Sequence, residues 1–366
     1  METLKPTADS APKGMTLLET LGIDLPIIQA PMAGVSSPAM AAAVSNAGAL
    51  GSIGVGATDA EGARRMIAAV RERSKRSLNV NVFCHRPATV DHTLEAAWLE
   101  FLRAHFERFG AKPPLGLKEI YRSFVEDDAM LAALLVDKPQ VVSFHFGLPS
   151  AERIRALREA GIVLLASVTN VAEGRAVVKA GVHAVVAQGY EAGGHRGVFD
   201  PEAEDDCLGT MALTRLLVRQ LDVPIIAAGG IMDGAGIAAA LRLGASAVQL
   251  GTAFIGCSES DADAGYRAAL ASDAANHTVM TRAISGRPAR CLGNRFTMLG
   301  AGISPRQIPS YPITYDAGKA LNAAAKAAHE TGYGAQWAGQ GAPLARELPA
   351  AELVAALAEE LRRDRQ

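Results

Sequence analysis

The sequence predicts an α/β fold, a TIM (β/α)8 barrel, because eight short apolar runs alternate with helical stretches along its 366 residues. Most runs are continuous and rich in β-branched residues, which is typical of parallel strands buried on both faces. Eight strand–helix units favour a closed barrel over an open sheet. The predicted strands cover residues 26–30, 49–53, 78–82, 141–144, 162–168, 184–187, 225–228 and 247–250.

Helical stretches with a repeating pattern of alanine, leucine and arginine connect these strands. Three of them stop at a glycine, which readily adopts the left-handed conformation of a helix C-terminus. The glycines are Gly161, Gly181 and Gly244. The predicted helices cover residues 60–73, 152–160, 172–180, 211–220 and 236–243.

Two segments go beyond a plain barrel. The third and fourth strands lie too far apart for one strand–helix unit, so we expect a helical insertion over about residues 86–135. Its aromatic-rich stretch at 98–109 is compatible with a lid and equally with a helix that packs elsewhere. Helix candidates at 261–272, 316–330 and 351–363 predict a helical C-terminal extension. We divide the chain into a barrel at 15–260, insertion included, and an extension at 261–366 packed beside it.

Composition excludes several classes of protein. Apolar residues make up 49% and charged residues 20%, and the net charge of −2 comes without long runs of like charge, which argues against nucleic-acid and anionic-membrane binding. No apolar run reaches the roughly 18 residues of a membrane span. Residues 1–14 lack the apolar core of a signal peptide. Four scattered cysteines indicate reduced thiols in a cytoplasmic protein, and no metal-binding pattern is present.

The loop at 188–197 carries the strongest functional signal. It follows the predicted sixth strand, and strand C-terminal ends form the catalytic face of such barrels. Gly193 and Gly194 let bare backbone approach a ligand, and Gln188, His195 and Arg196 stand beside them. Histidine is well suited to move a proton near neutral pH, so we expect His195 to be catalytic.

Other strand ends carry weaker signals. Ala30, Pro31 and Met32 follow the first strand and fit either a cofactor-contacting turn or an ordinary connection. In the third strand, the two-residue period places Asn79 and Asn81 on one face, where a ligand or a buried water network could satisfy their amides. His145 ends the fourth strand between two phenylalanines, and a packed and a functional histidine are equally compatible with that position.

The turns after the seventh and eighth strands predict a phosphate site. TIM barrels often bind phosphate through the backbone of these two loops. Gly229 and Gly230 follow the seventh strand, and the segment 249–252, Gln249-Leu250-Gly251-Thr252, closes the eighth. The sequence lacks a Rossmann glycine motif, a P-loop and a nucleophile elbow. A phosphorylated planar cofactor fits these features, and FMN fits better than FAD, whose adenylate needs a site of its own.

These motifs together resemble the nitronate monooxygenase family, formerly called 2-nitropropane dioxygenases. The resemblance covers about residues 20–345, including the insertion, and the tail 337–342 looks like that of class I members. It rests on Gln29-Ala30-Pro31-Met32, Asn79-Val80-Asn81, Gln188 with Glu191-Ala192-Gly193-Gly194-His195, Ala228-Gly229-Gly230 and 249–254. It implies an FMN-dependent TIM barrel that oxidises nitronates, such as propionate 3-nitronate, with O2 to carbonyl products plus nitrite or nitrate.

The resemblance also implies roles for individual residues. His195 would be the catalytic histidine, and His145 a second polar group over the flavin. A nitronate is already an anion, so a cationic or hydrogen-bonding His195 would hold its oxygens, whereas a neutral nitroalkane would need it as a base. We expect FMN to contact Ala30, Pro31, Met32, Asn81, Gln188, Gly193, Gly194, Gly229, Gly230, Gln249, Leu250, Gly251 and Thr252.

Two other functions remain compatible with parts of the sequence. FMN-dependent enoyl-acyl-carrier-protein reductases share the motif around His195, but lack the long insertion and the tail 337–341. A non-catalytic flavin- or phosphate-binding barrel would need neither His195 nor His145. We expect small-molecule partners only, namely a nitronate and O2, and the sequence leaves a homodimer open.

Overall fold

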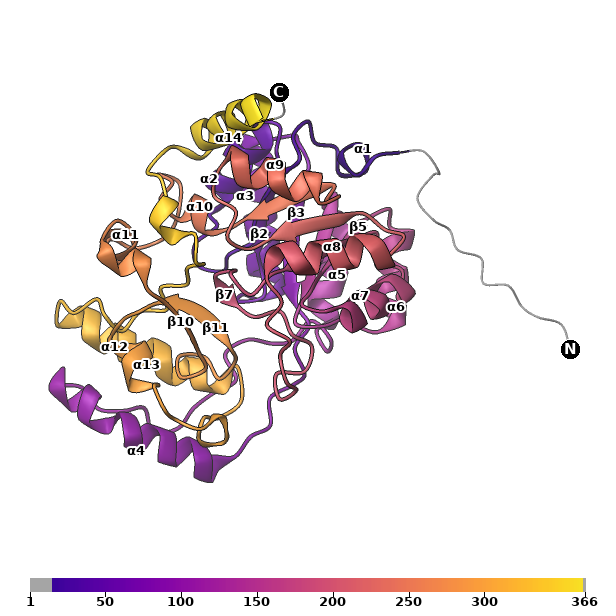
Figure 1. Cartoon of the computed structure of the whole chain (residues 1–366). Helices are drawn as coiled ribbons and strands as arrows, with labels where there is room; N and C mark the ends of the chain where they lie inside the picture. The colour runs from indigo at the N-terminus through magenta and orange to yellow at the C-terminus, as the bar shows by residue number, and fades with distance from the viewer. Residues whose placement is uncertain (1–14, 365–366) are drawn as a thin grey trace, which may run out of the picture.

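The computed structural model describes residues 15–364 and confirms the TIM barrel (Figure 1). Eight parallel strands form one sheet in the order β1-β9-β8-β6-β5-β4-β3-β2. The two edge strands meet where the amide of Gln29 donates to Leu50 O at 2.9 Å and that of Leu50 to Ile27 O at 3.0 Å. The barrel strands are β1 Ile27–Gln29, β2 Gly51–Gly54, β3 Leu78–Phe83, β4 Val141–His145, β5 Val163–Val168, β6 Ala184–Gln188, β8 Ile225–Ala228 and β9 Ala247–Leu250.

Helices surround the strands and bury their apolar faces against them. Most of these helices begin at a residue whose side chain accepts from a free amide of the first turn, which fixes their start; these residues are Ser37, Asp59, Asp127, Ser150, Asn170 and Asp233. The helices are α2 Pro38–Asn46, α3 Ala60–Arg73, α5 Asp128–Asp137, α6 Ala151–Glu159, α7 Val171–Lys179, α8 Thr210–Gln220, α9 Gly234–Arg242 and the short α10 Thr252–Ile255.

The barrel interior is closed at the N-terminal ends of its strands. There α1, Leu17–Leu21, packs Leu17 and Leu21 into a cluster with interior residues such as Ile28 and Val163. Ligand access is therefore left to the opposite end, where strands point their carboxyl termini. Among the described residues no helix has the length and apolar character needed to cross a membrane. Residues 1–14, on which the expectation about a signal peptide rests, lie outside the described part.

The insertion after β3 divides into two helices with different neighbours. Helix α4, His92–Arg108, packs beside α13 in the extension (Figure 1), and Trp98 and Phe106 join the apolar cluster there. Helix α5 contacts α3 and α6, so it occupies the ring position between β3 and β4. The aromatic stretch thus forms a packing helix rather than a lid.

The extension contains helices, as expected, and also two strands that the sequence analysis did not predict. Strands β10, Thr278–Thr281, and β11, Ala289–Leu292, form a sheet with β7, Gly194–His195. These strands are short and lack a continuous apolar run, so their sequence gives little signal. The remaining elements are α11 Ala264–Leu270, α12 Arg295–Leu299, α13 Ile313–Ala327, α14 Ala350–Asp364 and the 3-10 helices η1 Asp273–Asn276, η2 Pro305–Gln307 and η3 Ala342–Leu344. Pairing of β11 with β7 ties the loop of His195 to the extension.

Candidate active site

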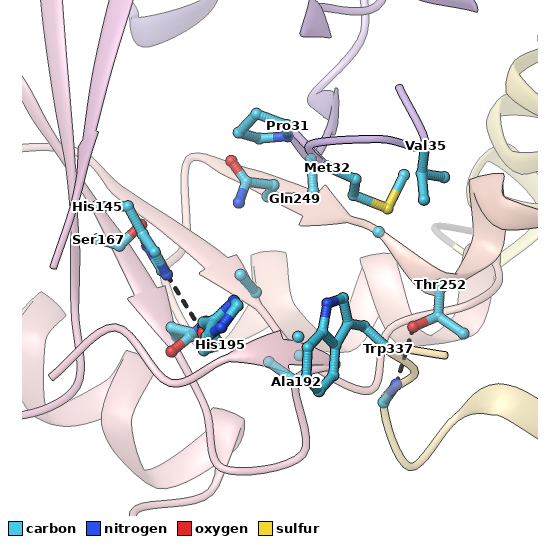
Figure 2. A pocket seen from close by; sticks show the side chains of 18 of the residues that line it. Pro31, Met32, Val35, His145, Ser167, Ala192, His195, Gln249, Thr252 and Trp337 are labelled. Carbon is cyan, nitrogen blue, oxygen red and sulfur yellow. Dashed lines mark hydrogen bonds between the residues drawn. The ribbon is translucent and has the colours of Figure 1, made fainter. Parts of the chain in front are cut away.

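A cavity lies at the carboxyl ends of the barrel strands, and every residue expected to contact FMN or to act in catalysis lines it; Figure 2 shows part of the lining. Those residues come from the ends of β1, β3, β4, β6, β8 and β9 and from the loops that follow. The two asparagines of β3 separate. Asn81 lines the cavity, while Asn79 lies deeper and donates to Ser52 Oγ at 3.1 Å.

One half of the cavity is built from backbone. Gly229 and Gly230 have φ of 119° and 70°, in the region that favours glycine. Their amides and that of Gly251 have no hydrogen-bond partner among the described residues. Donors left unpaired at the edge of a cavity need an acceptor, and phosphate oxygens supply one.

The tail at 337–341 encloses this half. The amide of Gly339 donates to Thr252 Oγ1 at 3.0 Å, a contact drawn in Figure 2. A Cβ on Gly341 would lie 2.6 Å from Met232 Cγ, and one on Gly339 would lie 2.7 Å from Glu191 O. These glycines therefore permit the tail to lie directly against the loops after β6 and β8.

The other half of the cavity is built from side chains around His195. Its ring lies 5.1 Å from the ring of Trp337, 5.4 Å from Tyr311 and 6.0 Å from Tyr315, measured between centroids. Its Nε2 is 2.9 Å from Ser285 Oγ. The Ser285 hydroxyl lies 3.2 Å from the carbonyl oxygen of Arg287 and can donate its proton there. With that proton so placed, His195 Nε2 is the donor and Nδ1 keeps a lone pair.

His145 and Gln188 position the loop that carries His195. Both His145 Nε2, at 3.2 Å, and Gln188 Nε2, at 2.9 Å, donate to the backbone oxygen of His195. Gln188 Oε1 accepts from the amide of Gly197 at 2.7 Å. A carbonyl can only accept, so this bond fixes the His145 tautomer with the proton on Nε2.

Burial makes both histidines neutral. The pKa of His195 is lowered to about 3, mainly by desolvation and to a smaller extent by His145 and Arg287 nearby. Desolvation likewise lowers the pKa of His145 to about 4, while its bond to the His195 carbonyl opposes the shift. The physical cause is that a charged imidazolium loses its hydration inside the protein. His195 is therefore a neutral hydrogen-bonding group in this cavity, not a cation.

Arg196, the arginine that follows His195 in the loop at 188–197, has a structural role. Its buried guanidinium pairs with Asp205 at 2.7 Å and 3.0 Å and lies over the Tyr190 ring at 5.6 Å. Arg196 Nη1 also donates a hydrogen bond to Gln188 O at 2.5 Å, and this bond anchors the end of β6. Arg196 does not line the cavity.

Sequence reasoning missed several side chains of the cavity and one residue that contacts its histidine. Ser285 was missed because it follows β10 in an ordinary loop, with no motif around it. Tyr315 lies in the first turn of α13 and Tyr311 just before that helix, so no helical spacing relates them and no motif marks either one. The other missed aromatic residues are Phe83, Tyr121 and Tyr266. Residues 15–364 contain no cluster of potential metal ligands.

Comparisons with known proteins agree with this architecture. A family model described as nitronate monooxygenase matches residues 15–360. A nitronate monooxygenase of Paraburkholderia phytofirmans is 63% identical over 346 residues, which cover 94% of each protein. Nitroalkane oxidase from Streptomyces ansochromogenes superposes with a TM-score of 0.87 and 42% identity, covering 95% of this chain and 98% of that one. FabK from Thermotoga maritima matches less closely, with a TM-score of 0.72 and 29% identity over 95% and 96%.

Proposed function

The chain belongs to the nitronate monooxygenase family, a family of flavin-dependent oxidoreductases, and we propose that it oxidises small alkyl nitronates with O2. Propionate 3-nitronate is the type substrate, and the products are a carbonyl compound plus nitrite or nitrate. The cofactor we propose is FMN, bound without a covalent link. The observation that carries the proposal is the pairing of a cradle of unpaired backbone amides with a neutral histidine in one cavity.

The cradle fits the phosphate of FMN. The unpaired amides of Gly229, Gly230 and Gly251 would hold it, and no side-chain cation is needed. A side chain in the cradle would be crowded, since a Cβ on Gly229 would lie 2.8 Å from Thr210 Oγ1 and 3.1 Å from Ala192 N. Asn81 donates its amide hydrogens to Ser143, so its Oδ1 is the atom available to a ring N–H of the cofactor.

FMN supplies the electron chemistry when it is bound. The residues of the chain bind the cofactor, orient the substrate and exclude competing reactions. His195 Nδ1 can accept a proton, whereas a nitronate carries no proton that has to be removed. Tyr311, Tyr315 and Trp337 give the side-chain half of the cavity an aromatic lining. A neutral nitroalkane would instead have to give a proton to His195, which is a weak base at a pKa of about 3.

The alternative function is FMN-dependent enoyl-acyl-carrier-protein reduction, which shares the motif around His195. The similarity to FabK supports this alternative, although the sequence identity to the nitronate monooxygenase of P. phytofirmans is much greater. Here Trp337 lies against His195, and the tail lies over the adjoining loop, where a long acyl arm would have to enter. A cavity partly covered by the tail favours a small anion over a long acyl chain.

Two assays test the proposal together. Cofactor released by heat is expected to run as FMN on chromatography, and released FAD would contradict the cofactor assignment. Oxygen uptake on addition of propionate 3-nitronate is expected, with no NADH oxidation on addition of an enoyl thioester. Activity in the second vessel alone would favour the reductase.

We further propose that the protein acts in the cytoplasm. The support is that Cys84, Cys207, Cys257 and Cys291 are all unpaired thiols. Thiol titration of the denatured protein, isolated without reductant, is expected to find all four thiols reactive, and a deficit of two would contradict a reducing compartment.

A further inference from the structure

Arg287 is a buried cation without a carboxylate partner. Only 3% of the residue is exposed, and no ion pair engages it among the described residues. One Nη donates to Val198 O, Nε is buried without a partner, and the guanidinium lies 4.2 Å from the centroid of the Phe146 ring. An unpaired buried charge is costly, so its presence calls for a function.

This charge lies behind the catalytic histidine. The Arg287 guanidinium lies over the Phe146 ring. The centroid of that ring is 5.6 Å from the centroid of the His195 ring and 5.4 Å from that of the Tyr311 ring. Ser285 links the same two residues, since it contacts His195 Nε2 and the Arg287 backbone. Arg287 is therefore one side chain removed from the atoms that line the cavity.

The acidic groups nearest to Arg287 are committed to other partners. Glu173 accepts from the amides of Thr169 at 2.7 Å and Phe199 at 2.8 Å. Asp200 pairs with Arg86 at 3.4 Å. Both carboxylates act on Arg287 only through space.

Apart from these two carboxylates, the titratable groups whose charges act on Arg287 are positive or neutral. Arg282 is paired with Glu202, and burial raises the pKa of Tyr311 well above its usual value. Desolvation lowers the pKa of His85 to about 4, which leaves it neutral like the two histidines of the cavity. Burial lowers the pKa of Arg287 to about 10, which still leaves it charged at neutral pH. Arg287 thus places a positive charge near His195 with no histidinium required, in addition to Lys319, whose Nζ lies 4.8 Å from the centroid of the cavity-lining Tyr121 ring.

We propose that Arg287 determines substrate charge, because its guanidinium, which forms no ion pair, makes the cavity prefer a nitronate anion over the corresponding neutral nitroalkane. This inference rests on the proposed function and identifies the residue that selects the ionisation state of its substrate. Two unit charges roughly 10 Å apart at an effective dielectric constant of about 20 interact strongly enough to change affinity about tenfold.

The first test compares Arg287→Met and Arg287→Lys with the parent holoenzyme. Ethylnitronate and nitroethane have the same carbon skeleton and differ in charge, and nitrate serves as an unreactive planar anion. In Arg287→Met we expect the KM for ethylnitronate and the Kd for nitrate, read from the flavin spectrum, to rise about tenfold. The KM for nitroethane should stay within about twofold, and Arg287→Lys should retain the preference for the anion. An equal rise for both substrates would overturn the proposal.

Arg290 supplies a matched control. It is also 3% exposed and lacks a carboxylate partner, but its guanidinium donates to Tyr190 O and lies over the Tyr190 ring at 4.8 Å. Arg290→Met removes a comparable buried charge away from the cavity. The ratio of the two KM values should remain that of the parent, and a tenfold change in it would count against a specific role of Arg287.

The second test needs no variant, so it holds even where Arg287→Met does not fold. Nitrate affinity of the parent enzyme should stay constant from pH 6 to 9 and fall only as pH rises through about 10, where Arg287 loses its proton. Affinity that falls tenfold per unit above pH 6.5 would assign the charge to a histidinium and overturn the proposal. Nitrate binding needs no turnover, so failure of nitronate oxidation with intact nitrate binding would overturn the proposed function alone.

Discussion

The two halves of the cavity are built in different ways. The half proposed to hold phosphate uses backbone amides of Gly229, Gly230 and Gly251, which follow two neighbouring strands of the barrel. The half around His195 uses side chains from the ends of strands, from the insertion and from several places in the extension, among them Tyr121, Ser285, Tyr311 and Trp337. The first half is local in sequence, and the second is assembled by tertiary packing.

This difference separates binding from selectivity. The backbone cradle is proposed to bind the cofactor phosphate, which is the same whatever the substrate. It therefore needs only glycines at fixed strand ends. Side chains around His195 determine which molecule can react. Their charge state is set by burial rather than by residue type. Substitutions in one half should therefore leave the function of the other half intact, and the following predictions test that separation.

The largest effect is expected from His195→Asn, in the side-chain half. Turnover of nitroethane should fall about 10²–10⁴-fold, because the group that accepts its proton is gone. Turnover of ethylnitronate should fall less, since that substrate is already ionised, and FMN content should match the parent. Anaerobic flavin reduction in a stopped-flow instrument measures both rates. A small and equal loss for the two substrates would make His195 a packing residue.

A smaller effect, on cofactor binding, is expected from Gly230→Val in the backbone half. Forcing a β-branched residue to φ of 70° costs about 1–3 kcal/mol, and its Cβ would lie 3.3 Å from Glu191 Cβ. FMN affinity should fall roughly 10–100-fold, while activity per bound FMN stays close to that of the parent. Fluorescence of released FMN measures the affinity.

Gly302→Val controls for backbone strain in that experiment. Gly302 has φ of 80°, and an added Cβ would meet nothing within 4 Å. It should lose stability to a similar extent and keep its FMN. If Gly230→Val binds FMN as tightly as the parent, the phosphate does not lie at the end of β8.

The sequence predicted the backbone half better than the side-chain half, for a physical reason. Gly229-Gly230 and Gly251-Thr252 can be located because strand order alone fixes where they meet. By contrast, Ser285 reaches His195 through the unpredicted strands β10 and β11, and a hydrogen bond across 90 residues leaves no local pattern. Trp337 was found only through the family resemblance of its tail.

The same limit applies to the insertion. The aromatic stretch in α4 was compatible with a lid or with a packing helix, since amphipathic periodicity shows that a face is buried but not what covers it. The structure places Trp98 and Phe106 against α13 and Tyr121 in the cavity. The choice between a lid and a packing helix depends on α13, which lies about 200 residues further along the sequence.

A third prediction concerns how His195 is oriented. Ser285→Ala removes the hydroxyl that contacts Nε2, and a hydrogen bond of this kind contributes about 1 kcal/mol, or roughly fivefold in rate. The kcat for nitroethane should fall by that factor, whereas KM, nitrate affinity and FMN content stay unchanged. Ser285→Thr keeps the hydroxyl and should restore kcat. No rescue by threonine would assign the loss to packing instead of tautomer control.

The smallest expected effect is an absence of pH dependence where an ordinary histidine would show one. A base works only when it is unprotonated, and desolvation lowers the pKa of His195 to about 3 from its usual 6.5. His195 is therefore ready to accept a proton throughout the range from pH 5 to 7.5, and kcat/KM for nitroethane should be flat there. An exposed histidine would lose about tenfold per unit below pH 6.5.

Stability has to be followed in the same experiment, because the same shift acts on folding. A histidine whose pKa is lowered in the folded state binds more protons when unfolded, so it contributes stability above pH 6.5 that is lost as pH falls toward 3. His85, His145 and His195 all act in this direction. The melting temperature should thus fall from pH 6.5 to 5 while kcat/KM of the folded enzyme does not. An inflection in kcat/KM near pH 6.5 at a constant melting temperature would show that His195 is solvated, and the side-chain half would then be an open site rather than a desolvated one.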